Sequence, residues 1–225
     1  LIDYSYLFWV DGVTCFAGFL MLFYFYGNKK HFRVHSATPE KQISRSPYKD
    51  YFYLYILSML LLIGFLFVQF FNTWPLYLRD SYFLQENQIG MLVALNAILV
   101  SILEMPLIHI LERKNNIQVI AWGSLLLFSG FAVLPFAQSF AYAIFTVVIW
   151  TFGEMLVFPL TAGLIANRAT DANRGKYMGL FSLNFSLAFV FGPMIGSTIY
   201  NNFGGDMLWY IAGLTGIFVW FNFMV

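Results

Sequence analysis

The chain contains seven apolar runs, each close to the roughly 20 residues that a helix needs to cross a lipid bilayer. They are Ser5–Tyr26, Phe52–Leu78, Ile89–Leu111, Ile117–Ala137, Ala141–Ala166, Tyr177–Tyr200, and Met207 to the end of the chain. Hydrophobic residues make up 60% of the sequence and charged residues only 10%, whereas a soluble domain carries about 25% charged residues. This much apolar surface has to face lipid, which excludes a soluble globular domain.

The same runs predict helices rather than the strands of a membrane β-barrel. They are longer than membrane strands and lack the two-residue alternation of a barrel. Because backbone N–H and C=O groups must be paired inside lipid, helices are the remaining solution. We therefore predict an all-α polytopic membrane protein with seven transmembrane helices. The chain begins without Met and stops inside an apolar run at Val225, so we also expect it to be part of a longer protein.

Several classes of function have no support in the sequence. The single cysteine, Cys15, provides no disulfide or cysteine–metal framework. No HExxH motif, phosphate-binding glycine loop or nucleophile elbow is present, so we predict neither an enzyme nor a cofactor or metal site. The formal net charge of +1 favours no nucleic-acid partner.

The positions of the basic residues predict the orientation in the membrane. Eleven of the 12 Lys and Arg residues fall in alternate connections between the runs, and only Arg79 falls on the other side. Cytoplasmic loops are enriched in Lys and Arg, so the basic side is predicted to be cytoplasmic. The polar, basic stretch 27–50 divides the chain into the last helix of one bundle (1–26), a cytoplasmic linker (27–50) and a six-helix bundle (51–225). A regulatory or lipid-binding role for this linker is the alternative to a plain solvated loop.

Several segments, in this order and topology, resemble the major facilitator superfamily of secondary transporters. They are Leu7-Phe8-Trp9-Val10-Asp11-Gly12, Thr73-Trp74-Pro75-Leu76-Tyr77-Leu78, Asn96 through Glu104-Met105-Pro106, Gly153-Glu154-Met155 with Pro159, Arg174-Gly175-Lys176-Tyr177-Met178-Gly179, and Gly192-Pro193-Met194-Ile195-Gly196. They look like parts of bacterial drug-efflux members. The resemblance implies the sixth helix, central linker and carboxyl-terminal half of that fold, working with an amino-terminal bundle that this chain lacks.

The loop after the third run carries a weaker form of a family signature. Glu112, Arg113 and Lys114 follow the acidic–Arg pattern of that loop, but Ile108 stands where the family has Gly. Together with Arg174 in a later connection, Glu112 and Arg113 are the predicted cytoplasmic loop charges.

Three carboxylates lie inside apolar runs and are the candidates for proton coupling: Glu154, Glu104 and Asp11. A charged side chain in the bilayer costs several kcal/mol, so such residues often mark ion or substrate pathways. Each could instead be protonated or hydrogen-bonded to a neighbouring helix and serve only to hold the bundle together.

The remaining candidates are polar residues and helix-bending residues. Candidates for the wall of a substrate cavity are Gln69, Asn72, Thr73, Asn96 and Asn184, and polar contacts between helices are the alternative. Candidates for bends or close helix packing are Pro75, Pro106, Pro159, Gly192, Pro193 and Gly196. Most Phe residues are expected to face lipid or pack, with a few lining a hydrophobic pocket.

The efflux-like resemblance implies a proton-coupled exporter of amphipathic or drug-like small molecules that works by alternating access. Its expected surroundings are the lipid bilayer of the plasma (inner) membrane, and its expected partners are protons, a small-molecule substrate and the amino-terminal bundle. Import or facilitated transport of a sugar, nucleoside or peptide is the nearest alternative. A non-transporting membrane scaffold or a membrane-embedded enzyme is the second.

Overall fold

A computed structural model describes the backbone of residues 5–27, 46–111 and 114–224, and the side chains of these residues except 5–7 and 25–27. The chain divides into two compact units, Leu1–Ile43 and Ser44–Val225. The first unit holds one helix, α1 (Ser5–Gly27), whose described side chains are all exposed. The predicted linker 27–50 lies mostly outside the described residues and stays a prediction.

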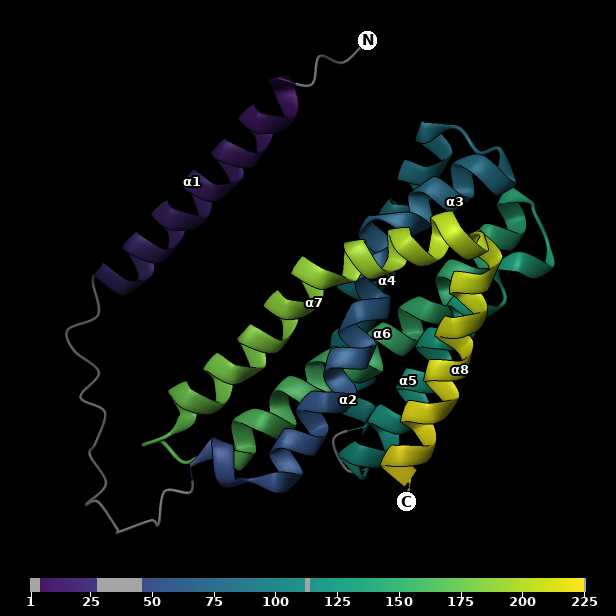
Figure 1. Ribbon diagram of the computed structural model, residues 1–225. Helices are drawn as coiled ribbons and strands as arrows, with labels where there is room; N and C mark the ends of the chain where they lie inside the picture. Colours follow the sequence, from purple (N-terminus) through teal and green to yellow (C-terminus); the bar gives the residue numbers. More distant parts are fainter. Residues whose placement is uncertain (1–4, 28–45, 112–113, 225) are drawn as a thin grey trace. The chain divides into compact units, whose positions relative to one another are not determined.

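The second unit is built from helices joined by short connections (Figure 1). Its α-helices are α2 (Tyr51–Phe67), α3 (Thr73–Tyr82), α4 (Glu86–Leu111), α5 (Asn116–Ala132), α6 (Phe140–Arg168), α7 (Arg174–Phe203) and α8 (Gly205–Met224). Short 3-10 helices occupy Pro47–Lys49, Val68–Phe71 and Leu134–Phe136. The described part of the chain contains no strand, and the predicted all-α fold class is confirmed.

The lengths and compositions of the helices agree with a multi-pass membrane protein. Among the described residues, six helical segments of the second unit are long and apolar enough to cross a membrane, and α1 adds a shorter apolar segment, Phe8–Tyr24. These segments coincide with the seven predicted runs to within a few residues at most ends.

The second predicted run differs from the structure, because it is not one continuous helix. The α-helix ends at Phe67, continues as a 3-10 turn, and stops at Asn72, whose backbone angles are φ −120° and ψ −73°. A new helix, α3, begins at Thr73 and carries Pro75 in its first turn. Pro75 has no N–H with which to bond the carbonyl of Phe71, so the helical ladder is interrupted at this point. The bend predicted at Pro75 therefore begins a few residues before the proline.

Helix α5 packs closely between α6 and α8 because glycines remove side chains at the contacts. A Cβ atom on Gly153 would lie 2.2 Å from the backbone nitrogen of Leu127, and one on Gly216 would lie 2.5 Å from the Cβ of Phe128. In lipid, helices associate largely through such close van der Waals packing. The ring of Phe131 is stacked between those of Trp150 and Trp209, with interplanar angles of 12° and 14°.

Helix α7 lies against α2 along a stripe of small residues spaced four apart. A Cβ on Gly64 would lie 2.9 Å from that of Ala188, and one on Gly192 would lie 3.3 Å from the Cβ of Val68. One turn further on, a Cβ on Gly196 would overlap the Gln69 amide. The predicted packing residues Gly192 and Gly196 thus lie where the two backbones approach each other closely.

At the opposite end of α2, Asp50 joins three helices. Its carboxylate caps α2 by accepting from the backbone N–H of Tyr53 and accepts again from the Tyr177 hydroxyl, at 3.2 and 2.9 Å. Arg168, the last residue of α6, donates to both carboxylate oxygens at 2.6 and 2.7 Å. The guanidinium also lies 4.6 Å from the ring centroid of Phe52. Asp50 therefore ties the start of α2 to the end of α6 and the first turn of α7.

Replacing Asp50 by Asn is expected to lower the free energy of unfolding by about 2 kcal/mol at neutral pH. At pH 2 the variant and the wild type should be equally stable. Hydrogen bonds from Arg168 lower the pKa of Asp50 from 3.8 to about 2, against the opposing effect of burial. A lowered carboxyl pKa contributes stability above pH 4 that disappears as the pH falls towards 2. The measurement is the free energy of unfolding between pH 7 and pH 2, in which the wild type should converge on Asp50→Asn.

Asp171→Asn is the matched control for this change. Asp171 is fully exposed and lies 3.9 Å from Arg174, a geometry in which ion pairs contribute little. An equal loss of stability in both variants would contradict the structural role assigned to Asp50.

Candidate transport site

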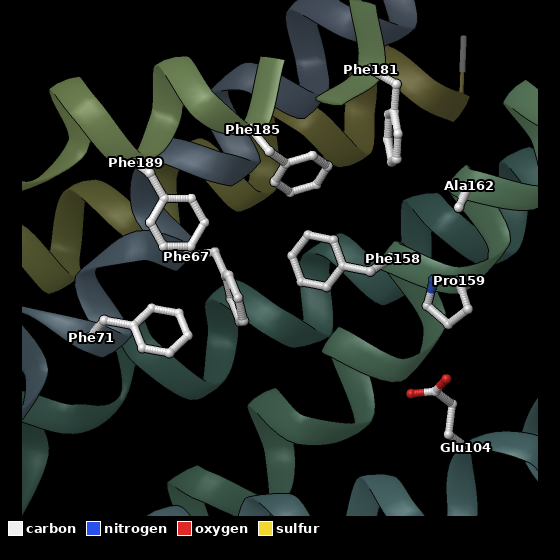
Figure 2. Close-up of a pocket in the computed structure, with 9 residues that line it drawn as sticks. All are labelled: Phe67, Phe71, Glu104, Phe158, Pro159, Ala162, Phe181, Phe185 and Phe189. Carbon is white, nitrogen blue, oxygen red and sulfur yellow. The ribbon is translucent and has the colours of Figure 1, made fainter. Parts of the chain in front are cut away.

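A cavity of about 450 Å³ lies between α2, α4, α6 and α7. Figure 2 shows its wall, which consists of aromatic rings on one side and a carboxylate on the other. The lining residues are Phe67, Phe71, Glu104, Phe158, Pro159, Ala162, Phe181, Phe185 and Phe189. The volume lies within the range of about 300–1,000 Å³ that is typical of small-molecule sites.

The phenylalanines form a connected aromatic surface. The rings of Phe67 and Phe158 meet edge to face with centroids 4.6 Å apart. Phe181 and Phe185 are in edge contact at 5.1 Å, and Phe185 lies 5.7 Å from Phe158. Phe181, Phe185 and Phe189 share one face of α7 because they are spaced four residues apart. Offset and edge-to-face ring pairs of this kind are favourable arrangements.

Of the described part of the chain, Glu104 is the only ionisable residue in the lining of this cavity. It projects from α4, and its carboxylate points towards Pro159 of α6 (Figure 2). The side chain is half-buried and has no hydrogen bond or ion pair within the part of the chain that the structure describes. Its carboxylate is therefore available to a ligand.

Glu154 lies on α6 and faces α4, next to this cavity but outside its lining. The amide nitrogen of Asn96 donates to the Glu154 carboxylate at 2.8 Å and to the hydroxyl of Thr151 at 3.0 Å. Thr151 is fully buried, whereas Asn96 and Glu154 are half-buried. Glu104 lies on the same helix as Asn96, eight residues or about 12 Å further along α4. The fold thus brings one predicted carboxylate, Glu154, into contact with one predicted polar residue, Asn96, and places Glu104 in the cavity lining.

Gln69 and Thr73 lie elsewhere, in the contact between α2, α3 and α7. The Gln69 amide nitrogen donates to the carbonyls of Phe65 and Gly192 at 2.7 and 2.8 Å, and its oxygen accepts from Thr73 at 3.0 Å. Both residues are buried. Neither lines the aromatic cavity, and their geometry matches the alternative of polar contacts between helices.

Asn72 and Asn184, the other two predicted polar residues, also lie outside the cavity lining. Asn72 is exposed and donates to the carbonyl of Val68 at 3.0 Å. Asn184 is buried on α7, one turn before Ala188 and on the same face. The three candidates on the second run are therefore divided between buried positions, Gln69 and Thr73, and an exposed one, Asn72.

The remaining predicted residues are distributed over both units. Asp11 lies on α1, where its backbone carbonyl accepts from the Thr14 hydroxyl at 2.9 Å. Pro106 and Pro193 lie inside α4 and α7, while Pro159 lines the cavity. Arg174 begins α7 and is exposed. Glu112 and Arg113 lie outside the described residues.

Sequence reasoning did not identify which phenylalanines line the cavity, nor the cluster around Asp50. The spacing of Phe181, Phe185 and Phe189 was the available signal for the aromatic wall. For the cluster, the signal was an Asp two residues before one apolar run and an Arg two residues after another.

Comparison with known proteins identifies the family. A family model described as Major Facilitator Superfamily matches residues 1–154 and 74–225. An uncharacterized MFS-type transporter of Bacillus subtilis, YqjV, is 26% identical over 173 residues, which cover 75% of this chain and 42% of the relative. A second B. subtilis relative, YhjO, is 24% identical over 179 residues, covering 78% and 43%. A Na⁺, Li⁺, K⁺/H⁺ antiporter of Planococcus maritimus is 25% identical over 139 residues, covering 60% and 33%.

The chain thus spans less than half the length of each of these relatives. The resemblance read from the sequence motifs is confirmed by the match of the family model along the chain and by the helical architecture. This chain belongs to the major facilitator superfamily of transporters.

Proposed function

We propose that this chain forms part of a secondary transporter that exports amphipathic, cationic small molecules in exchange for protons. The observation that carries the proposal is the cavity of about 450 Å³, whose wall is formed by six phenylalanines and one carboxylate, Glu104. A second carboxylate, Glu154 of α6, accepts a hydrogen bond from Asn96 of α4, the helix that carries Glu104.

The lining of the cavity favours an aromatic or aliphatic cation over a polar solute. A sugar would leave its hydroxyl groups without partners against phenylalanine rings, at a cost of a lost hydrogen bond for each. A cation gains attraction from the ring faces and from the carboxylate of Glu104. Among the residues that the structure describes, no Lys or Arg lines the cavity to receive an anionic substrate.

The two carboxylates offer a route for coupling to protons. A cation bound at Glu104 favours the ionised form of the nearby carboxylates, and protonation weakens the attraction for the cation. Substrate and proton therefore oppose one another in binding, and this coupling is reciprocal. The Planococcus relative is itself named an antiporter, which supports exchange as the mode of transport.

Alternating access would require an amino-terminal bundle that packs against this one, as in other transporters built from repeats. Only Leu92 of α4 is buried among the described residues, so α4 has a large face available for such a contact. In this proposal the bundle lies in the plasma membrane, the linker 27–50 is cytoplasmic, and the two bundles rock about the cavity.

Exchange of alkali cations for protons is the second candidate function. Thr151 and Glu154 bring a hydroxyl and a carboxylate together with the Asn96 amide, and oxygen donors of these types bind hard cations. Addition of NaCl to acid-loaded vesicles discriminates the two, because only this candidate discharges the pH gradient without an organic cation.

The first candidate is tested by replacing Glu104 with Gln in the complete transporter, reconstituted into vesicles. Loss of the carboxylate is expected to raise the KM for ethidium driven by a pH gradient about tenfold, since charge-assisted contacts contribute about 1.5–3 kcal/mol. Glu86→Gln on the same helix is the control, because Glu86 is exposed in the first turn of α4. An unchanged KM in Glu104→Gln would exclude the cavity as the cation site.

A further inference from the structure

A second cavity, of about 320 Å³, lies where α4 ends, α5 begins and α6 passes beside them. Its lining residues are Leu111, Lys114, Asn115, Gln118, Val119, Trp122 and Leu156. It is separate from the aromatic cavity, with which it shares no lining residue. Nothing in the proposed transport cycle uses it.

The chemistry of the lining changes with depth. Lys114, Asn115 and Gln118 lie at the level where α5 begins, so the polar groups gather at one end of the cavity. Trp122 follows Gln118 by four residues and lies about 6 Å further along the helix. Leu156 of α6 lies beside Gly123, one residue beyond Trp122, whereas Leu111 and Val119 are aliphatic residues near the polar end. Polar groups at one end, followed by the Trp122 indole and Leu156, match the order of a bilayer from headgroup to acyl chain.

The polar end carries positive charge. Lys114 is the only charged residue in the lining, and its ammonium forms no ion pair with any carboxylate among the described residues. The Asn115 side-chain oxygen accepts from the N–H of Ile117 at 3.1 Å, so the group that Asn115 can offer to a ligand is its NH₂ donor. The ammonium and the amides of Asn115 and Gln118 together suit a phosphodiester.

We propose that this cavity binds one anionic glycerophospholipid from the leaflet at the basic side of the membrane. The phosphodiester contacts Lys114 and Gln118, and the first part of an acyl chain lies against Trp122 and Leu156. Free phosphate would leave the aliphatic wall empty, and a zwitterionic lipid would bring its own cation towards Lys114. Basic pockets between transmembrane helices are a recurring form of anionic-lipid site.

The test uses the chain in nanodiscs and lipids brominated on the upper acyl chain, which quench nearby indoles. The signal of the cavity is the difference in quenching between the wild type and Trp122→Phe. At equal mole fractions, brominated phosphatidylglycerol is expected to bind with about fivefold higher affinity than brominated phosphatidylcholine. This ratio corresponds to the attraction of one basic residue for an anionic lipid at a membrane surface.

Lys114→Gln should remove this preference, and Lys176→Gln is the matched control. Lys176 is exposed in the first turn of α7 and lines none of the cavities described here, so the preference should persist in that variant. Equal quenching of Trp122 by both lipids in the wild type would overturn the proposal. So would displacement of the phosphatidylglycerol signal by millimolar inorganic phosphate, which would mark a site for the phosphate alone. Neither result bears on ethidium export.

Discussion

Glu154→Gln is expected to reduce pH-gradient-driven transport to the level of empty vesicles. Asn96 donates to the Glu154 carboxylate, and the amide oxygen of Gln can accept the same hydrogen bond. The variant should therefore insert and fold as the wild type does. It cannot take up or release a proton, so a cycle that depends on protonation of this residue stops.

The measurement that isolates this effect is a pair of flux assays on the same vesicles. Net efflux of ethidium driven by a pH gradient should be lost, whereas exchange of internal for external ethidium without net proton movement should continue. Glu86→Gln is the control, because it also replaces a carboxylate by an amide but at an exposed position of α4. Full gradient-driven efflux by Glu154→Gln would show that another group carries the proton.

The Gly153→Ala variant is expected to lose the close contact between α5 and α6. The added Cβ would lie 2.2 Å from the nitrogen and 2.4 Å from the Cα of Leu127. These are backbone atoms, which no change of rotamer can move, so the two helices would have to separate along their contact. Overpacking typically costs about 1–3 kcal/mol, and a contact with backbone belongs at the upper end of that range. The midpoint of thermal unfolding in detergent should fall accordingly.

Gly163→Ala is the matched control, because Gly163 lies on the same helix and a Cβ there would meet nothing within 4 Å. Alanine is the better helix former by roughly 1 kcal/mol, so this variant should be as stable as the wild type or slightly more so. If both variants unfold at the same temperature, α5 and α6 cannot be as close as the structure places them.

Much of the architecture was predictable because each apolar segment that crosses the bilayer has to form a helix on its own. A run such as Ala141–Ala166 must be helical in lipid, whatever its neighbours are. The break before Thr73 was not predictable from the hydropathy of the run, because apolar residues occur in 3-10 turns as well as in α-helices. Only the helix-breaking chemistry of Pro75 hinted at it.

The candidate site was predictable in its residue types but not in its assembly. Glu104 and Glu154 were distinguished by their depth in apolar runs, and their role in transport remains a prediction. That Glu104 faces a cavity while Glu154 is bonded to Asn96 depends on how α4 and α6 are rotated about their axes. With apolar residues all round both helices, the sequence pattern favours no rotation.

The sequence by itself determined that this chain crosses a membrane as helices, how many apolar segments it has, and on which side its basic residues gather. These properties follow from the cost of placing charge and unpaired backbone in lipid, a cost that each segment bears alone. The tertiary structure decided which faces meet: glycine against backbone between α5 and α6, Gln69 against α7, and six phenylalanines in one cavity with Glu104. Lipid solvates every apolar face equally well, so helix rotation is settled by shape complementarity and polar contacts between segments distant in the sequence.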